Sequence, residues 1–337
     1  MGPSPVTIKE IAKLLGISKS TVSRALQKRS DVNAETQRKV QELAQELRYQ
    51  PNAMAVNFKN QRTNTIGVII PETANTFFSR AICGIQKIAT SAGYNVVVCQ
   101  SNECYTTERS TLLSLISNHV DGVLISVSRE TENTDHFCTL LEKKIPVVFF
   151  DRICESLETS QVFTDNYEVS FQATQHLIDQ GCKRIAILAG PQRLYTSSRR
   201  LAGYRDALLK NNIDYNPELL MFPDFRPENI EEFIRHLING DNSPDAIFAI
   251  NDMAAIEIMH VIKKAGLKIP QDIAVLGFNN EKIGQFVEPS LTSIDLPALE
   301  MGSTAAEMLL SRIKNPDHQA EKKLIPSRLV VRDSTRR

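Results

Sequence analysis

The chain has 337 residues, 42% of them apolar and 23% charged, which is ordinary for a soluble globular protein of two or three domains. Its formal net charge is zero, which as a whole-chain value indicates no polyanionic partner. The sequence contains no apolar run near the ~18 residues of a membrane span, no signal peptide and no C-x-x-C pair among its six cysteines. We therefore expect a cytoplasmic protein with no membrane partner, disulfide framework or zinc site.

The charge is distributed unevenly along the chain. Residues 1–62 contain eleven Lys or Arg and five Asp or Glu, a net charge of +6, so the remainder carries −6. This asymmetry is typical of a nucleic-acid-binding arm on an acidic body, although a solvated helical surface would give the same count.

Three short helices are predicted between residues 7 and 48. Thr7 and Glu10 have the spacing of a capping box, and Gly16 interrupts the apolar pattern where a turn at positive φ is needed. Ser18 is the expected cap of the second helix and Asn33 of the third. A helix, a glycine-containing turn and a second helix form the pattern of a helix-turn-helix, so we expect a small all-α DNA-binding domain over residues 1–50.

The second helix of this motif enters the DNA major groove N-terminus first. Its apolar positions are Val22, Ala25 and Leu26, which should face inward. Arg and Lys bond to guanine edges, and Ser bonds to bases or phosphates. The residues left on the outward side are Lys19, Ser20, Ser23 and Arg24. A three-helix bundle without a DNA-binding role would show the same periodicity.

Residues 51–63 are predicted to form a hinge helix and a polar linker. Pro51 ends the third helix, and residues 52–59 suffice for only two helical turns. An isolated helix below ~12 residues is marginal, so this segment should not be stable alone.

From Thr65 onward, continuous apolar and β-branched runs are separated by helical patterns. Strands without polar alternation are buried on both faces, as in parallel sheets covered by helices. The βα blocks recur before and after about residue 163, so we expect a two-lobed α/β structure with two parallel, Rossmann-like sheets. The predicted strands are Thr65–Ile70, Asn95–Cys99, Gly122–Ile125, Pro146–Phe150, Arg184–Ala189, Ala246–Ile250 and Ile273–Phe278. The expected lobes are residues 64–162 with 292–322, and residues 163–291 with 323–333.

Ligands of open parallel sheets bind beyond the carboxyl ends of the strands. Polar and aromatic residues that follow the predicted strands should therefore face one another across a cleft between the lobes. Short polar side chains with an Arg suit a polar metabolite, and an aromatic ring stacks on an apolar ring face. The predicted ligand-binding residues are Asn75, Phe77, Phe78, Asn102, Ser126, Asp151, Arg152, Arg200, Asn251 and Asn279.

Several of these residues could instead have a purely structural role. Arg200 can form a surface ion pair, Asp151 can cap the next segment, and Phe77 or Phe78 can belong to the core.

A two-lobed α/β body is also compatible with functions other than DNA regulation. A two-lobed solute receptor would need an export signal and no basic helix-turn-helix, and a sugar-acting α/β enzyme would consume its ligand. Nucleotide-loop, zinc-protease and serine-hydrolase motifs are missing from the sequence, so we expect no catalytic residues, metal or cofactor.

Several segments resemble, in order, those of the lac repressor (LacI/GalR) family of bacterial transcriptional regulators. They include Val6-Thr7-Ile8-Lys9-Glu10-Ile11-Ala12, the run from Gly16 to Leu26 and Arg200-Leu201-Ala202-Gly203-Tyr204. Further matches are residues 47–53, 65–71, 249–252 and 325–332, so the resemblance spans residues 6 to about 333. It implies a repressor that binds a pseudo-palindromic operator in double-stranded DNA as a homodimer. A small polar effector, such as a sugar or sugar derivative, would control operator affinity from the cleft between the lobes.

The resemblance also implies roles for individual residues. Lys19, Ser20 and Arg24 would read bases, and Thr21 and Ser23 would contact phosphates. The implied DNA-binding residues are Thr7, Ser18, Lys19, Ser20, Thr21, Ser23, Arg24, Asn33, Asn52, Ala55 and Phe58.

Two positions depart from the family pattern. Phe58 stands where relatives usually insert a Leu into the minor groove. Phe is an accepted wedge there, but it could instead pack against the sensor lobe. Asn279 stands where relatives commonly have Asp. Its amide both donates and accepts hydrogen bonds without charge, which argues against a cationic ligand and leaves a sugar open.

Overall fold

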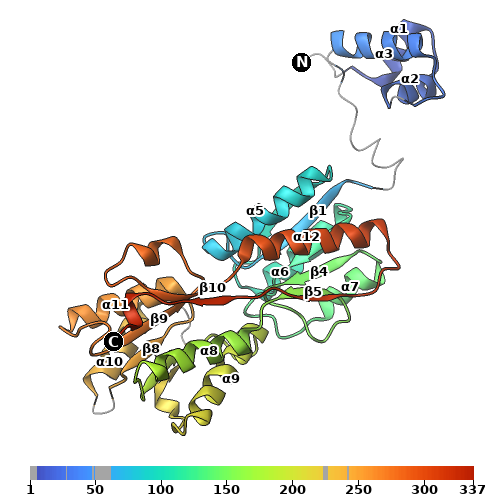
Figure 1. The fold of residues 1–337 in the computed structure, drawn as a ribbon. Coiled ribbons are helices and arrows are strands. Elements are labelled where there is room, and N and C mark those ends of the chain that lie inside the picture. The colour runs from blue at the N-terminus through green and yellow to red at the C-terminus, as the bar shows by residue number, and fades with distance from the viewer. Residues whose placement is uncertain (1–5, 28, 48, 50–61, 223–226, 241–242) are drawn as a thin grey trace. The chain divides into compact units, whose positions relative to one another are not determined.

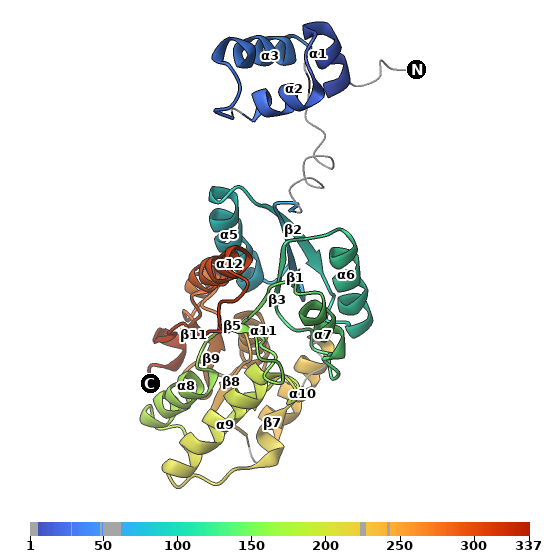
Figure 2. The ribbon, with the colours of Figure 1, turned by 90° about the vertical axis from the view of Figure 1, so that its right-hand side faces the viewer.

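A computed structural model describes residues 6–27, 29–47, 49, 62–222, 227–240 and 243–337. The chain divides into two compact units, Met1–Thr63 and Asn64–Arg337, each with its own core (Figures 1 and 2). The predicted hinge helix at residues 52–59 lies outside the described residues.

The first unit contains the three predicted helices, α1 (Ile8–Leu15), α2 (Lys19–Leu26) and α3 (Ala34–Glu46). The Glu10 carboxylate accepts a hydrogen bond from the Thr7 backbone N–H at 2.6 Å, and Gly16 has φ +63°. The Ser18 hydroxyl caps α2 by accepting from the Thr21 N–H at 3.0 Å. The Asn33 amide oxygen caps α3 by accepting from the Glu35 N–H at 2.8 Å. The helix starts expected from the sequence are therefore confirmed.

The second unit consists of two lobes, each built on a six-stranded sheet. The first lobe has the strand order β11-β5-β4-β3-β1-β2, and the second has β12-β10-β9-β8-β6-β7. All described strand pairs are parallel except β10 with β12. The first sheet contains β1 (Thr65–Ile70), β2 (Asn95–Gln100), β3 (Gly122–Ile125), β4 (Val147–Phe150), β5 (Ser160–Phe163) and β11 (Lys322–Leu324). The second contains β6 (Ile185–Leu188), β7 (Leu220–Met221), β8 (Ala246–Phe248), β9 (Ala274–Phe278), β10 (Thr292–Asp295) and β12 (Arg328–Val330).

Helices cover both faces of each sheet, which buries most of the continuous apolar strands as predicted. The exception is β2, which lies at the edge of the first sheet and is only partly buried. In the first lobe, α5 and α12 pack together over one face, and α6 and α7 lie on the other (Figure 1). In the second lobe, α8 pairs with α9 and α10 pairs with α11. The first-lobe helices are α5 (Thr76–Ser91), α6 (Tyr105–Ser117), α7 (Asp135–Glu142) and α12 (Ala298–Lys314). Those of the second are α8 (Asn166–Asp179), α9 (Tyr195–Lys210), α10 (Pro227–Asn239) and α11 (Asp252–Lys264). Short 3-10 turns occur at Pro217–Leu219, Lys282–Gln285 and Asp333–Thr335.

The structure corrects the expected division between the lobes. Strand β10 pairs with β9 in the second sheet, so the chain returns to the first lobe after Asp295 rather than before residue 292. Strand β11 pairs with β5 in the first sheet, so the last crossing follows Leu324. Because β11 is a short, exposed edge strand, it lacks the kind of apolar run from which seven of the other strands were predicted. The strands β5, β7, β10 and β12 were not predicted either. In the described part of the second unit, the chain thus crosses between the lobes three times.

A buried carboxylate holds the start of α11 under the second sheet. Asp252 accepts a hydrogen bond from the Ser293 hydroxyl at 2.5 Å and another from the Glu281 N–H at 2.5 Å. A Cβ atom at Gly277 would collide with this carboxylate, which explains the glycine in β9. Burial raises the pKa of Asp252 to about 6. The two hydrogen bonds lower this pKa, but their effect is smaller than that of burial.

This pKa predicts how one residue's contribution to stability depends on pH. Between about pH 4 and pH 6 the folded chain binds more protons at Asp252 than the unfolded chain, so this contribution falls as pH rises. The unfolding free energy of the wild type minus that of Asp252→Asn should be larger at pH 4 than at pH 7, by on the order of 1–3 kcal/mol. Urea unfolding at both pH values measures the difference. A difference that grows toward pH 7 would contradict this account.

Candidate functional site

The outward side of α2 presents the residues that the sequence placed there. Val22 and Ala25 are buried against the other two helices, whereas Lys19, Ser20 and Arg24 are exposed. Thr21 and Ser23 are partly exposed beside them. The core of this small unit therefore fixes the orientation of α2, and its basic and hydroxyl side chains remain accessible.

Arg24 has a partner on its own unit. Its guanidinium lies 3.1 Å from the Asp31 carboxylate, and its Nε donates to the Ser20 carbonyl at 3.4 Å. About half of each of the two charged side chains is exposed, 45% for Arg24 and 52% for Asp31. An ion pair this accessible to water contributes little free energy, so Arg24 can exchange Asp31 for a nucleic-acid group at low cost.

Residues 7, 18 and 33 immediately precede the three helices. The first-turn N–H groups of a helix attract phosphate, and Thr7, Ser18 and Asn33 are the capping residues at these ends. The remaining predicted DNA-binding residues, Asn52, Ala55 and Phe58, lie outside the described residues.

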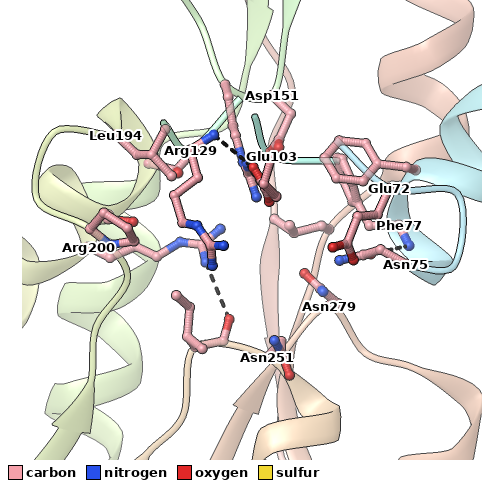
Figure 3. A pocket seen from close by; sticks show the side chains of 17 residues that line it. Glu72, Asn75, Phe77, Glu103, Arg129, Asp151, Leu194, Arg200, Asn251 and Asn279 are labelled. Carbon is pink, nitrogen blue, oxygen red and sulfur yellow. Dashed lines mark hydrogen bonds and ion pairs between the residues drawn. The ribbon is translucent and has the colours of Figure 1, made fainter. Parts of the chain in front are cut away.

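A polar cavity of about 170 Å³ lies between the two lobes of the second unit (Figure 3). Figure 3 shows Glu72, Asn75 and Phe77 on one side, Arg200 on the opposite side, and Asn251 and Asn279 on a third. The residues that line the cavity are Glu72, Asn75, Phe77, Phe78, Glu103, Arg129, Asp151, Arg152, Pro191, Leu194, Thr196, Ser197, Arg200, Ile250, Asn251, Asn279 and Leu296.

The cavity brings together eight of the ten predicted ligand-binding residues, namely Asn75, Phe77, Phe78, Asp151, Arg152, Arg200, Asn251 and Asn279. Both phenylalanines also belong to the first-lobe core, with ring centroids 5.3 Å apart. Asn251 has a second role, because its side-chain oxygen caps α11 by accepting from the Ala254 N–H at 2.8 Å. The amide nitrogen of Asn251 keeps its capacity to donate.

Two predicted residues do not line the cavity. Ser126 is fully buried, because the sheet pairing continues one residue beyond β3 through a bond from its N–H to the Ile69 carbonyl. Asn102 is exposed in a left-handed turn with φ +55°, where its side-chain oxygen accepts from Gln100. The same turn carries Glu103 into the cavity lining instead.

Sequence reasoning missed several lining residues. Glu72 lies two residues beyond the end of β1, and Glu103 and Arg129 each follow directly after a polar residue near a strand end. Thr196 and Ser197 precede Arg200 by one helical turn of α9, so a helical-face argument would have placed them beside it.

Arg200 is held rigidly at the cavity wall. Its Nε donates to the Asn166 side-chain oxygen at 2.8 Å, and its guanidinium carbon lies 3.5 Å from the centre of the Phe278 ring. Burial lowers the pKa of Arg200 to about 10, partly offset by the nearby Asp151 carboxylate, so it stays charged at neutral pH. These contacts rule out a surface ion pair as the role of this residue.

Asp151 lies at the end of β4 with only 8% of its surface exposed. Burial raises the pKa of its carboxyl group, while Arg152 and Arg200 act in the opposite direction. The Arg152 guanidinium is engaged by Glu103, with contacts of 2.7 and 2.9 Å to the two carboxylate oxygens. Asp151 thus lies near two arginines, Arg152 and Arg200, and is positioned to accept hydrogen bonds from a ligand.

The charges of the cavity lining balance. Three carboxylates (Glu72, Glu103 and Asp151) and three guanidiniums (Arg129, Arg152 and Arg200) give a formal sum of zero. Asparagine, serine and threonine side chains add neutral donors and acceptors, and the phenylalanines add an apolar wall. This lining matches an uncharged ligand with several hydroxyl or amide groups and one apolar face.

The described part of the chain has neither a metal cluster nor a membrane-crossing helix. Its histidine, cysteine, aspartate and glutamate side chains form no group of three or more with the geometry of a metal site. None of its helices combines the length and the apolar character that crossing a membrane requires.

Comparisons with known proteins agree with this architecture. Residues 7–52 match the family model "Bacterial regulatory proteins, lacI family", and residues 174–335 match the periplasmic binding protein-like domain. The chain is 32% identical over 332 residues to the HTH-type transcriptional repressor PurR of Aliivibrio fischeri (strain MJ11), covering 97% of this chain and 98% of the relative.

Solved structures show the same fold over nearly the whole chain. The lac repressor dimer bound to operator and the anti-inducer ONPF is 25% identical, with a TM-score of 0.88 over 98% of this chain and 99% of that one. The complex of the transcriptional regulator CelR with cellobiose is 28% identical, with a TM-score of 0.74 over the same shares. The sequence match to PurR, which spans both units, shows that the chain belongs to the lacI family of bacterial regulatory proteins.

Proposed function

We propose that this chain is a sequence-specific transcriptional repressor whose operator affinity changes when an uncharged polar effector, a sugar or sugar derivative, binds between its two lobes. The observation that carries the proposal is the exposure of Lys19, Ser20 and Arg24 on α2 while Val22 and Ala25 are buried on its other side. A relative named as a repressor and a neighbour solved on its operator support it.

The DNA-binding roles follow from the chemistry of the side chains. Lys19, Ser20 and Arg24 would contact base edges in the major groove, and Thr21 and Ser23 the flanking phosphates. Thr7, Ser18 and Asn33 would guide phosphates to the helix N-termini that they cap. Contacts of Asn52, Ala55 and Phe58 in the minor groove stay a prediction from the resemblance.

The effector class follows from the lining of the cavity. Asp151 and Arg200 both line the cavity and interact electrostatically, so they offer an acceptor and a donor near each other, as vicinal hydroxyl groups require. Phe77 and Phe78 provide the apolar surface on which a sugar ring stacks. The zero formal charge of the lining favours a neutral ligand, and a structural neighbour was solved with cellobiose. We infer that the cavity binds its ligand without transforming it, and that the protein acts in the cytoplasm, where operator DNA is found.

The chain is proposed to act as a homodimer, as the lac repressor does in its operator complex. Both lobes expose large apolar side chains, among them Val97 on the edge strand β2 and Phe286, which is 71% exposed. Burial of such apolar side chains against a second copy of the chain removes them from water and favours association. Sedimentation equilibrium is expected to give twice the chain mass of 37.7 kDa, and a monomer at micromolar concentration would contradict the dimer.

Selection of bound sequences from random DNA duplexes tests the regulator function directly. The full chain is expected to enrich a pseudo-palindromic sequence, because two reading helices related by a twofold axis face two half-sites. Failure to enrich any sequence at moderate salt, with or without candidate sugars, would favour a two-lobed solute receptor instead.

Arg24→Ala should weaken binding to the selected operator by about 1–3 kcal/mol and relax the preference at one base pair, because a guanidinium reads a guanine edge bidentately. Lys39→Ala is the matched control, since Lys39 is an exposed cation paired with Glu35 on α3. Fluorescence anisotropy with operator and random duplexes measures both affinities. Equal losses on the two duplexes would show that Arg24 contacts only phosphate.

Arg200→Ala should abolish the response of operator binding to effector and leave effector-free binding intact, because Arg200 lines the cavity and belongs to the second unit. Arg199→Ala is the control, since this neighbouring arginine is exposed and lies over the Tyr167 ring. Thermal shift over a panel of sugars identifies the effector, and anisotropy then measures the response. A full response in the Arg200 variant would remove this residue from the binding site.

A further inference from the structure

One arginine links the two lobes at the edge of the cavity. Arg193 lies between β6 and α9 in the second lobe. Its Nε donates to the backbone carbonyl of Arg129 in the first lobe at 2.6 Å, and its NH1 lies 3.4 Å from the Glu132 carboxylate. The neighbours Pro191 and Leu194 line the cavity from one side and Arg129 lines it from the other, so the link sits beside the ligand space.

Arg193 contacts residues 128–132 of the first lobe, which we call the clamp segment. It is anchored by Glu108, a fully buried carboxylate on α6. Glu108 accepts from the Ser128 N–H and hydroxyl and from the Thr131 hydroxyl, each at 2.7 Å. The second carboxylate in this network, Glu103, accepts from the Arg129 N–H at 2.7 Å. A main-chain carbonyl fixed in this way offers Arg193 a stationary acceptor.

His136 completes the anchor from α7. Its Nε2 lies 2.8 Å from Glu108, and its ring packs between Tyr105 and Phe137. The clamp segment is therefore tied to two helices of the first lobe before Arg193 reaches it. Movement of Arg193 relative to Arg129 consequently reports movement of the second lobe against the first.

The two contacts of Arg193 differ in strength. The pair with Glu132 is exposed, with 43% of Arg193 and 76% of Glu132 accessible, and exposed ion pairs contribute little. The hydrogen bond from the charged guanidinium to the Arg129 carbonyl is short and is expected to contribute more. The backbone contact, rather than the ion pair, should therefore dominate.

We propose that Arg193 is a positioning residue that holds the cleft closed and so sets the affinity for effector without being selective for its chemistry. The proposal rests on the proposed function of the cavity as an effector site. A ligand that contacts both lobes binds the closed form, and its apparent affinity falls in proportion to the fraction of protein that is closed. Loss of the Arg193 link lowers that fraction.

The absence of tryptophan from the chain permits a test that needs no ligand. Tyr195 lies two residues after Arg193, and its ring lies 6.0 Å from that of Phe163 across the lobe boundary. Tyr195→Trp in the full chain thus introduces one emitting side chain at this boundary. Acrylamide quenching of its fluorescence is expected to rise by about twofold when Arg193→Ala is added, because an open boundary admits the quencher.

Arg205→Ala in the same Tyr195→Trp background is the matched control. Arg205 is an exposed arginine of α9 that donates to the Tyr215 hydroxyl at 2.7 Å, a contact within the second lobe. It should leave quenching unchanged. Equal quenching in the Arg193 and Arg205 variants would overturn the proposal, and circular dichroism checks that each variant is folded. Phe163→Trp serves as the reporter if Tyr195→Trp fails to fold.

A second measurement uses cellobiose and D-glucose as probes in isothermal titration. For whichever sugar binds the parent chain, Arg193→Ala should weaken binding by about threefold to tenfold, and Glu132→Ala by less than about twofold. Arg193→Lys should recover only part of the loss, because Lys lacks the planar donor at Nε. An effect of Glu132→Ala as large as that of Arg193→Ala would overturn the dominance of the backbone contact.

The two measurements separate the link from the effector site. Increased quenching in the Arg193 variant, with no binding of either sugar by the parent chain, would support the link and count against the sugar class in the proposed function. Sugar binding by the parent with unchanged quenching in the Arg193 variant would support the effector site and reject the link.

Discussion

The central strands of the second unit are buried on both faces, and this constraint determines where the unit can place polar side chains. A strand such as β3 or β4 has no solvated face, so a charged or amide side chain can be accommodated only where the strand ends. Because neighbouring strands are parallel, these ends gather at one edge of each sheet. The cavity is formed where polar residues from both lobes meet, and its charge balance follows from which residues occupy the strand ends.

Much of this arrangement could be predicted from the sequence because local rules dominate it. Thr7, Ser18 and Asn33 cap their helices as their side-chain chemistry requires, and Gly16 adopts the positive φ that ended the first predicted helix. The continuous apolar runs identified the main strands, and the strand-end rule placed most of the predicted ligand-binding residues in the cavity lining.

The remainder depends on loop geometry and on pairing between distant segments. The rule identifies which loop approaches the cavity, but not which residue of that loop points inward. Ser126 does not reach the cavity because the pairing of β3 with β1 extends one residue further than predicted. Glu103 lines the cavity in place of Asn102 because these two successive residues are left-handed and turn the chain. Strands β10 and β11 were assigned to the wrong lobes because both are short and neither was recognised as a strand. Strand β10 stays in the second sheet beside β9, whereas β11 is an exposed edge strand whose partner, β5, precedes it by more than a hundred residues.

The three crossings between the lobes have a mechanical consequence. Two of them are joined where the Thr164 hydroxyl donates to the Ile325 carbonyl at 3.1 Å, so these two connections form one bundle rather than two independent tethers. Bodies attached along such a bundle resist sliding and pulling apart, and rotation about the attachment is their softest displacement. Binding of effectors of different shape would then produce the same motion, a change in the angle between the two lobes. The residues that recognise the effector could therefore change during evolution while the connections that transmit effector binding as lobe rotation stay the same.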